Sequence, residues 1–243
     1  MRLWQFFDAM AQRIYFIIGT DTGVGKTVFT ALLTRRLREK EVRVAALKPL
    51  CSGGRVDARV LRAASGHVLS LDEINPWHFR APLAPLLAAR LEKKSVKLRE
   101  VISHIQQVSQ RFETVVVEGA GGLRSPLGEN FDAQDCLLAL RATPILICPN
   151  RLGAINQVLL VLNSLPKSVA KKLQIVLVSP RFPNTASRSN LKLLAEFIEP
   201  SHLHVLPWIC ETKKLRLDQR IRKKLDKIIV AVTGARASAG TRP

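Results

Sequence analysis

A glycine-rich turn at residues 19–27, with the sequence GTDTGVGKT, lies between an apolar run at residues 14–18 and a helical pattern at residues 28–37. In such a turn the backbone N–H groups point inward and the following helix presents its positive end, so that together they bind phosphate. Lys26 adds a positive charge beside a β- or γ-phosphate, and Thr27 supplies a hydroxyl to Mg²⁺. The sequence therefore predicts a buried strand, a phosphate-binding loop and a helix, in this order.

One glycine of this loop departs from the usual spacing. The pattern G-x-x-x-x-G-K-[ST] would place its first glycine at the position of Thr20, whereas here Gly19 stands one residue earlier. A merely tight strand-to-helix turn is the alternative, but such a turn needs neither the Gly-Lys-Thr triplet nor a buried strand before it. We therefore interpret the segment as a variant P-loop.

The length and composition favour a single large domain. A chain of 243 residues, of which 47% are hydrophobic, can bury a substantial core, and neither a linker nor an internal repeat divides it. We expect an extension at residues 1–13, the main domain at residues 14–210 and a basic tail at residues 211–243. In the tail we expect a basic amphipathic helix, then an apolar patch at residues 228–232, and disorder over the last ten residues.

The cysteines and the apolar runs indicate where the protein works. The four cysteines, Cys51, Cys136, Cys148 and Cys210, are widely spaced, and no Cys/His cluster suits zinc. This usage is typical of a reduced, cytosolic protein. Polar residues interrupt the apolar N-terminus before a signal-peptide core forms, and no later apolar run is long enough to span a bilayer. We expect a cytoplasmic protein with no membrane contact.

The formal net charge of +19 would suit a protein that binds nucleic acid. However, lysine and arginine are scattered through the helical patterns, with one denser stretch at residues 213–227, and no basic arm with interleaved aromatics occurs. We interpret most of this charge as solvated basic faces that also attract anionic nucleotides, and we do not expect nucleic acid to be a partner.

Apolar strand patterns alternate with helical patterns along the chain. Beyond the first, strands are predicted at residues 42–47, 114–117, 143–149, 173–178 and 204–208. This alternation predicts an α/β fold with a mostly parallel sheet and helices on both faces. The aromatic residues of the proline-punctuated segment 72–91 and His104, which lies off the apolar stripe of the helix at residues 98–108, are assigned to packing and to the surface respectively.

Charged residues follow two of the predicted strands, at the edge where parallel α/β sheets bind ligands. Lys48 ends the second strand, and Glu118 ends the strand at residues 114–117, just before the glycines 119, 121 and 122. An acid at such a strand end, opposite a P-loop, is well placed for a second Mg²⁺ contact. Asp57 has two interpretations: it approaches the same metal as Thr27, or it is the N-cap of the helix that follows.

A further anion site is predicted where residues 150–156 turn into a helix. The first N–H groups of a helix have no intrahelical acceptor and suit a carboxylate.

Four motifs occur in the order and spacing of the dethiobiotin synthetase family, which the chain resembles over roughly residues 14–209. They are GTDTGVGKT at 19–27, KPLCSG at 48–53, VEGAGG at 117–122 and LGAIN at 152–156. Together they are far more specific than a P-loop alone, and that family carries the same displaced glycine. The resemblance makes the main domain a single P-loop NTPase-type ligase domain.

The resemblance implies an ATP-dependent ligase that uses CO₂ to close a ureido ring on 7,8-diaminononanoate, giving dethiobiotin, ADP and phosphate. One amine captures CO₂ as a carbamate, the γ-phosphate of ATP is transferred to it, and the second amine attacks the mixed anhydride. Such a reaction depends on positioning and charge neutralisation and needs no covalent nucleophile from the protein.

The resemblance also implies a role for each matching residue. Lys26, Lys48 and Thr22 serve catalysis, and Thr27, Asp57 and Glu118 hold Mg²⁺. The nucleotide is bound by Gly23, Val24, Gly25, Lys26, Thr27, Val28, Glu118, Ser179 and Pro207. The substrate is bound by Thr22, Lys48, Ser52, Gly153, Ala154 and Asn156. Members of the family are homodimers in which the helix start at residues 153–156 serves the active site of the partner subunit.

Two other classes of protein share this type of loop. Cobyrinic acid amide synthases carry an additional glutaminase domain, for which this chain has no room. A deviant P-loop ATPase that partitions DNA or positions a division apparatus would suit the basic charge, but such ATPases carry a lysine near the start of the loop, where Thr20, Asp21 and Thr22 stand here. One departure from the resembled family concerns the base: Ser179 replaces the asparagine that reads adenine, so we expect looser base discrimination.

Overall fold

A computed structural model describes residues 13–209 and 219–233 of the chain. Residues 1–12, the last ten residues and the start of the basic tail lie outside the described part, and so do the expectations for them. The strands are β1 Arg13–Gly19, β2 Val44–Leu47, β3 Leu50–Ser52, β4 Trp77–Phe79, β5 Thr114–Gly122, β6 Pro126–Gly128, β7 Phe131–Asp132, β8 Thr143–Pro149, β9 Gln174–Val178 and β10 Leu203–Leu206. The helices are α1 Lys26–Glu39, α2 Val56–Ala64, α3 Leu71–Ile74, α4 Pro85–Leu91, α5 Leu98–Ser109, α6 Ala133–Ala139, α7 Ala154–Ser164, α8 Lys167–Ala170, α9 Thr185–Leu194 and α10 Gln219–Thr233, with a 3₁₀ turn, η1, at Pro200–His202.

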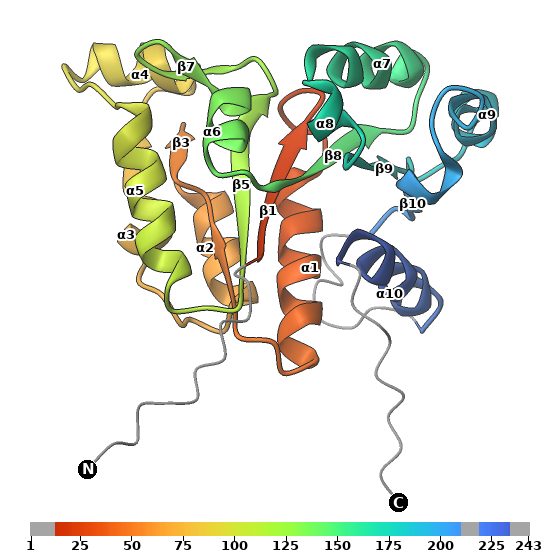
Figure 1. The fold of residues 1–243 in the computed structure, drawn as a ribbon, viewed down its shortest axis with the longest axis horizontal. Coiled ribbons are helices and arrows are strands. Elements are labelled where there is room, and N and C mark those ends of the chain that lie inside the picture. The colour runs from red at the N-terminus through yellow and green to blue at the C-terminus, as the bar shows by residue number, and fades with distance from the viewer. Residues whose placement is uncertain (1–12, 210–218, 234–243) are drawn as a thin grey trace, which may run out of the picture.

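In the described part of the chain, six strands form the central sheet, in the order β10-β9-β8-β1-β5-β2, and every neighbouring pair is parallel. The predicted parallel α/β fold is confirmed. Two small sheets accompany it: β3 and β4 pair in parallel, and β6 and β7 pair antiparallel. Because β1 lies between β5 and β8, the loop that follows β1 opens at the middle of the sheet edge (Figure 1).

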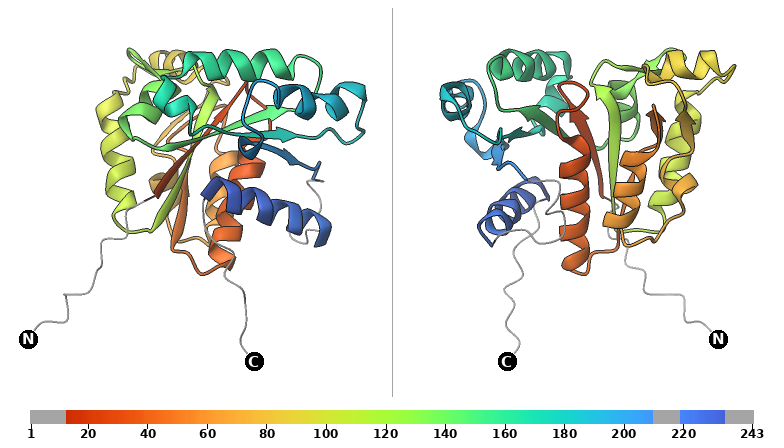
Figure 2. Two further views of the ribbon diagram at one scale, coloured as in Figure 1. Left: turned by 45° about the vertical axis from the view of Figure 1, so that its right-hand side comes forward. Right: turned by 180° about the vertical axis from the view of Figure 1, so that it is seen from behind.

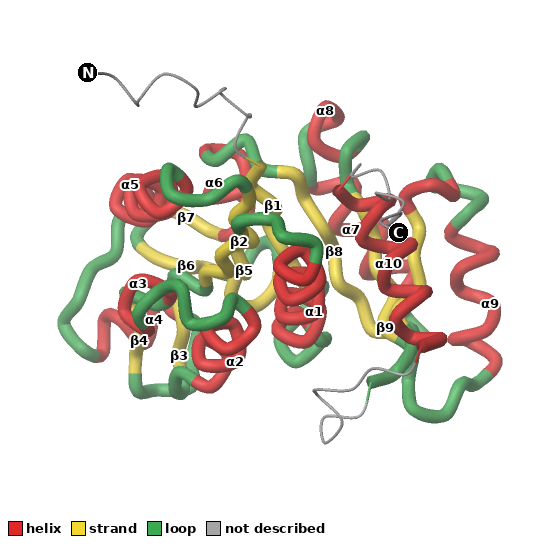
Figure 3. Tube along the Cα trace, turned by 90° about the horizontal axis from the view of Figure 1, so that it is seen from below, coloured by secondary structure: helices red, strands yellow, loops and turns green. Residues whose placement is uncertain are grey.

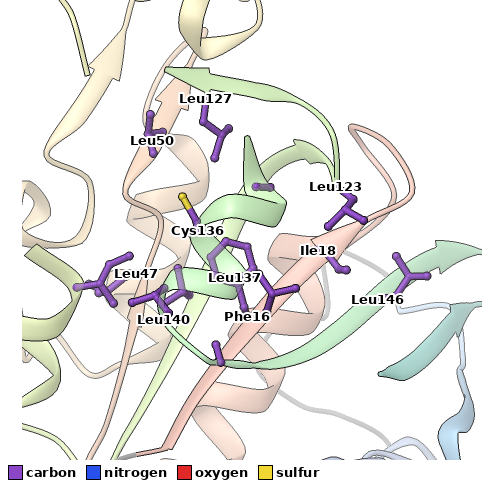
Figure 4. Packing of buried hydrophobic residues seen from close by; sticks show 14 of the residues in the cluster. Phe16, Ile18, Leu47, Leu50, Leu123, Leu127, Cys136, Leu137, Leu140 and Leu146 are labelled. Carbon is purple, nitrogen blue, oxygen red and sulfur yellow. The ribbon is translucent and has the colours of Figure 1, made fainter. Parts of the chain in front are cut away.

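Alternate residues of β1 enter two separate cores, one on each face of the sheet. Phe16 and Ile18 pack with α5, α6 and α7, while Tyr15 and Ile17 pack with α1 and α10. Figure 4 shows the first of these cores around Phe16 and Leu137. Burial on both faces explains why the central strands are continuous apolar runs.

The helices cover both faces of the sheet, as predicted. The view from below shows α5 and α6 on one side of the strands and α1 and α10 on the other (Figure 3). Among the described residues, no helix combines the length and the apolar character needed to cross a membrane.

Helix α10 belongs to the second core. Its apolar side chains Leu225, Ile228, Ile229 and Val232 are buried with Phe29, among others. The predicted amphipathic helix therefore exists, but the apolar patch at residues 228–232 is part of the same helix rather than a separate segment after it. Figure 2 shows α10 beside α1, below β10. The expected division at residue 210 does not separate this helix from the core.

A bidentate ion pair joins α10 to α1. Arg36 donates to Asp226 through Nη2 at 2.8 Å and through Nε at 2.5 Å. This pairing raises the pKa of Arg36 and lowers the pKa of Asp226, in each case chiefly through the hydrogen bonds between them. The interior side of α10 also reaches the sheet, because the hydroxyl of Tyr15 donates to the carbonyl of Thr233 at 3.4 Å.

The segment before α5 contains three short elements. Residues 72–91 contain the end of α3, the strand β4 and the helix α4, and their aromatic residues pack as expected, with Phe79 buried. The surface assignment of His104 is wrong: its ring lies edge-on to Trp77, with 5.8 Å between centroids, and its Nε2 lies 2.7 Å from the carbonyl oxygen of Glu73. A half-buried imidazole fills the space between α5 and β4.

Candidate active site

A cleft of about 630 Å³ opens at the carboxyl edge of the sheet, between the loop after β1 and the segments that follow β3 and β5. It is lined by Thr22, Gly23, Gly25, Lys26, Thr27, Val28, Lys48, Cys51, Ser52, Asp57, Pro82, Leu83, Ala84, Pro85, Glu118, Ala120, Gly121 and Ser125. The structure thus brings the predicted catalytic and metal-binding residues into one cavity, although they come from four separate parts of the chain.

The loop after β1 presents its backbone to this cleft. Gly23 and Gly25 have φ angles of 73° and 100°, which side chains other than glycine rarely adopt, and Gly25 is the N-cap of α1. Within the described residues, no backbone acceptor is found for any N–H group of residues 23–28. This row of free donors at a helix start is suited to phosphate.

The geometry explains the displaced glycine. A Cβ atom added to Gly19 would lie 2.8 Å from the carbonyl oxygen of Asp21 and 2.8 Å from Lys26 Nζ. The loop closes directly over this residue, and any side chain here would force it open. Thr20 instead extends the sheet pairing, because its N–H donates to the carbonyl of Ile147 at 3.0 Å.

Lys26 is a buried lysine without a carboxylate bonded to it among the described residues. Its Nζ donates to the loop carbonyl of Asp21 at 2.7 Å. Burial, and after it the positive charge of Lys48, lowers the pKa of Lys26 to about 8. The loop therefore holds a lysine whose charge is destabilised until an anion arrives.

Lys48 and Glu118 form the centre of the charged cluster. Lys48 Nζ lies 2.6 Å from Glu118 Oε1 and 3.1 Å from Asp57 Oδ2. Burial by itself lowers the pKa of Lys48, but the carboxylates of Glu118 and Asp57 outweigh it and hold this pKa above its usual value. The hydroxyl of Thr27 donates to the same Glu118 Oε1 at 2.7 Å. The prediction that residues from two strand ends meet at the P-loop is confirmed.

Asp57 is not the N-cap of α2. The helix begins at Val56 with Arg55 as its N-cap, and Asp57 lies in the first turn, where it faces Lys48. Of the two interpretations of Asp57, the structure supports the one that places it at the site.

The donor set of this cluster suits Mg²⁺. Glu118 is 1% exposed, and its second oxygen, Oε2, has no hydrogen-bond donor among the described residues. A buried carboxylate oxygen without a partner is costly, and a bound cation would satisfy it. Thr27, Asp57 and Glu118 supply one hydroxyl and two carboxylates. This is a usual protein share of a Mg²⁺ site that takes its other ligands from phosphate and water.

The remaining cleft residues include several that the sequence did not single out. Ser52, which was predicted, donates to the carbonyl of Leu83 at 2.6 Å and so fixes the wall made by residues 82–85. Ser125 was not predicted; its Oγ accepts from the N–H of Gly122 at 2.8 Å and lies close to Gly121. The only signal for it was its position shortly after the EGAGG motif.

Cys51 also lines the cleft, but its environment does not favour a thiolate. Burial raises the pKa of the Cys51 thiol, and its Sγ donates to the carbonyl of Gly54 at 2.7 Å. Thiolates are the nucleophilic form of cysteine, so this residue is a packing group of the wall.

Ser179 and Pro207 lie together but outside the cleft lining. Ser179 follows β9 and donates its N–H to the carbonyl of Leu206, the last residue of β10, at 2.9 Å. The preceding residue, Val178, lies beside the loop, because a Cβ added to Gly25 would contact its side chain at 3.5 Å. Beyond these residues, the guanidinium of Arg181 lies 5.5 Å from the ring centroid of Trp208. These strand ends therefore adjoin the phosphate loop.

The helix start at residues 153–156 does not enter the cleft of its own chain. Gly153, the N-cap of α7, has a φ of 89°, and Leu152 before it is 87% exposed. Within the described residues, the N–H groups of Ile155 and Asn156 have no acceptor. The helix start is a free set of donors on the surface of the molecule.

Comparison with known proteins gives a family for this chain. A family model described as an AAA domain matches residues 13–215. The "ATP-dependent dethiobiotin synthetase BioD" of Bacillus velezensis is 31% identical over 88% of this chain and 94% of that protein. The protein of the same name from Akkermansia muciniphila is 37% identical over 76% of this chain and 87% of that protein. The chain belongs to the dethiobiotin synthetase family.

Solved structures of low sequence identity share the fold of this chain. A putative plasmid partition protein from Borrelia burgdorferi bound to AMPPNP has a TM-score of 0.58 at 12% identity, and it covers 92% of this chain and 98% of its own. The cell division ATPase MinD of Pyrococcus furiosus has a TM-score of 0.57 at 15% identity, over 91% of this chain and 98% of its own. At these identities the likeness concerns the P-loop α/β fold alone.

Proposed function

We propose that this chain is an ATP-dependent dethiobiotin synthetase, a ligase of biotin biosynthesis that joins CO₂ to 7,8-diaminononanoate and closes the ureido ring. The cluster of Lys48 with Glu118 and Asp57 beside the phosphate loop supports this proposal best. Its buried cation, Lys48, suits a role between the γ-phosphate and a small anionic substrate. The relatives named above, which match most of this chain, carry the same activity in their names.

The reaction begins when the nitrogen of one substrate amine attacks CO₂ and loses a proton, giving a carbamate. Lys48 neutralises the carbamate oxygens from one side, and Thr22, at the rim of the loop, binds them from the other. Ser52 contacts the diamine from the opposite wall. These residues act by holding charge and orientation, so none of them forms a bond to the substrate.

In the second step a carbamate oxygen attacks the γ-phosphorus of ATP and ADP leaves. Lys26 and the free N–H groups of residues 23–28 hold the β- and γ-phosphates. Thr27, Asp57 and Glu118 would hold Mg²⁺, which would neutralise charge on these phosphates. The second amine then attacks the carbonyl carbon of the mixed anhydride, the carbon–oxygen bond to phosphate breaks, and the ring closes with release of phosphate and a proton.

The carboxylate of the substrate is received by a second copy of the chain. In a homodimer, the start of α7 with Gly153, Ala154 and Asn156 would reach across to the partner's cleft. Its free N–H groups on an exposed surface, away from the cleft of its own chain, support this arrangement.

The base of ATP lies against the strand ends that carry Ser179 and Pro207, next to the contact between Val178 and Gly25. A serine has one hydroxyl where an amide offers a paired donor and acceptor, so it reads the base less strictly.

We place the enzyme in the cytoplasm, where Cys51, Cys136 and Cys148 stay free thiols, as they are in the structure.

The purified protein tests the function directly. With MgATP, bicarbonate and 7,8-diaminononanoate, it is expected to form dethiobiotin and to release phosphate only when the diamine is present. Phosphate release that depends on DNA or on a protein partner instead of the diamine would identify the protein as a P-loop switch ATPase and overturn the proposal.

A further inference from the structure

Two buried asparagines connect the start of α7 to the neighbouring helix α9. Asn150 follows β8 and is 2% exposed, and Asn190 lies on α9 and is 4% exposed. The Nδ2 of Asn190 donates to Asn150 Oδ1 at 2.9 Å and to the carbonyl of Arg151 at 2.9 Å. None of the mechanism above uses these side chains.

The bond from Asn190 to the carbonyl of Arg151 acts at the start of α7. The oxygen of Arg151 also accepts from the N–H of Ala154 at 3.1 Å, which is the first N–H of α7. This bond turns the N–H of Ala154 inward, while the next donors, at Ile155 and Asn156, have no acceptor among the described residues. Asn190 thus holds the carbonyl oxygen of Arg151, which fixes the first N–H of α7 and so orients the free donors that follow it.

Both ends of this connection are fixed. Asn150 donates its own N–H to the carbonyl of Val178 at 2.8 Å and its Nδ2 to the carbonyl of Ser187 at 2.8 Å. The first turn of α9 is closed by a capping box between Asn184 and Ser187. The turn at residues 151–153 is therefore attached to a strand and a capped helix rather than to another loop, which is the support a precise binding group needs.

We propose that Asn190, acting with Asn150 on the carbonyl of Arg151, positions the start of α7 to receive the substrate carboxylate. Asn190 is a positioning residue, because it touches neither substrate nor nucleotide. The inference rests on the proposed function, in which this helix start binds the carboxylate of 7,8-diaminononanoate in the partner's cleft.

The test compares two substrates that differ only in the carboxylate. In 2,3-diaminononane a methyl group replaces it, while both amines are retained. The expected result for Asn190→Ala in the full-length protein is a rise of about 10-fold in KM for 7,8-diaminononanoate with little change in kcat, because misplaced binding groups lose affinity steeply. The kcat/KM for 2,3-diaminononane should stay within about twofold, so discrimination between the substrates falls about 10-fold.

Ser65→Ala is the matched control. Ser65 is also buried and joins two backbone groups, accepting from the N–H of Ala46 and donating to the carbonyl of Leu61, but it belongs to neither the cleft nor α7. The Ser65→Ala variant should be less stable but should discriminate between the two substrates as the wild type does. If Asn190→Ala does not fold, Asn190→Ser, which keeps a shorter donor, is measured in its place and should show a smaller loss of discrimination.

Three outcomes would overturn the inference: unchanged discrimination in the Asn190 variant, an equal loss in Ser65→Ala, or a wild type that forms dethiobiotin without distinguishing the two substrates. A wild type that forms no dethiobiotin at all would instead refute the proposed function.

Discussion

Lys48 Nζ and Thr27 Oγ1 both donate to one oxygen of Glu118, at 2.6 and 2.7 Å, and leave the other oxygen of this carboxylate without a donor among the described residues. The P-loop and the ends of two strands are thus joined through a single atom. In the proposed function, Mg²⁺ would bind the oxygen of Glu118 that has no donor, while Lys48 and Thr27 bond the other oxygen.

Lys48→Ala is expected to lower kcat for dethiobiotin formation by about 100-fold, since one preorganised charge-stabilising donor contributes about 3 kcal/mol to the transition state. The measurement is product formation at saturating ATP and diamine. The exposed Lys94, which pairs only with Glu92 and a nearby ring in the described residues, is the control, and Lys94→Ala should keep normal turnover. Near-normal activity in Lys48→Ala would refute the role given to Lys48.

Glu118→Gln keeps the shape of the side chain and removes its charge. The Mg²⁺ concentration for half-maximal activity should rise about 10-fold or more, because carboxylate oxygens are strong ligands of Mg²⁺ and an amide oxygen is a weak one. The titration is made at constant ATP. Glu129→Gln, which alters an exposed partner of Arg90, should leave the Mg²⁺ requirement unchanged. An unchanged requirement in Glu118→Gln would remove Glu118 from the metal site.

The lowered pKa of Lys26, about 8, gives ATP binding a pH dependence. The free loop carries the charge below pH 8 and loses it above, and the γ-phosphate favours the charged form, so the pKa of Lys26 rises on binding. Binding should take up about 0.9 proton at pH 9 and about 0.1 proton at pH 7 through this group. Affinity should therefore weaken as the pH rises above 8.

Calorimetry in buffers of different ionisation enthalpy measures this uptake. Lys26→Arg, whose guanidinium stays charged, corrects for protons exchanged by ATP itself and should take up none at pH 9. Equal uptake by the wild type and Lys26→Arg at pH 9 would show that Lys26 is charged throughout.

The meeting of Lys48, Glu118 and the P-loop could be predicted from sequence, because parallel strands end at one edge of the sheet and each residue follows a recognisable strand. Asp57 could not be assigned, since both interpretations place an acid at the beginning of a helix, and only the packing of α2 beside Lys48 decides between them. Ser125 reaches the cleft through a loop without periodicity. In such a loop no periodic pattern shows which side chains point into the cleft.

The order of the strands and the position of α10 could not be predicted from the sequence either. An amphipathic pattern predicts that a helix has an apolar face but not which surface covers it. The face of β8, β9 and β10 on the side of α1 is covered by the last described helix, and no motif in the sequence marks this placement.

Helix α10 should therefore contribute to global stability. Ile229 is 0% exposed in the second core, and Ile229→Ala should lower the free energy of unfolding by about 2–4 kcal/mol, as for other large-to-small core changes. Urea denaturation measures it. Lys227→Ala, on the exposed side of the same helix, should change stability by less than about 0.5 kcal/mol. Equal free energies of unfolding for the wild type and Ile229→Ala would mean that α10 does not contribute to the stability of the core.

A shared active site predicts complementation between two inactive variants. Lys26→Ala removes the phosphate-binding lysine, and Asn156→Glu places a negative charge where the helix start should receive the substrate carboxylate, so each homodimer should be inactive. In a mixed dimer, one site combines both defects, while the other combines an intact P-loop with an intact helix start. Random assortment of equal amounts gives half mixed dimers with one active site each, and activity should recover to about a quarter of that of the wild type.

The recovery is measured as dethiobiotin formation after subunit exchange, which is confirmed with differently tagged chains. Each variant incubated alone is the control and should stay inactive. If each cleft is completed by its own chain, both subunits of every mixed dimer still carry a defect of their own. Mixing then restores nothing, which separates the two arrangements without any structure of the dimer.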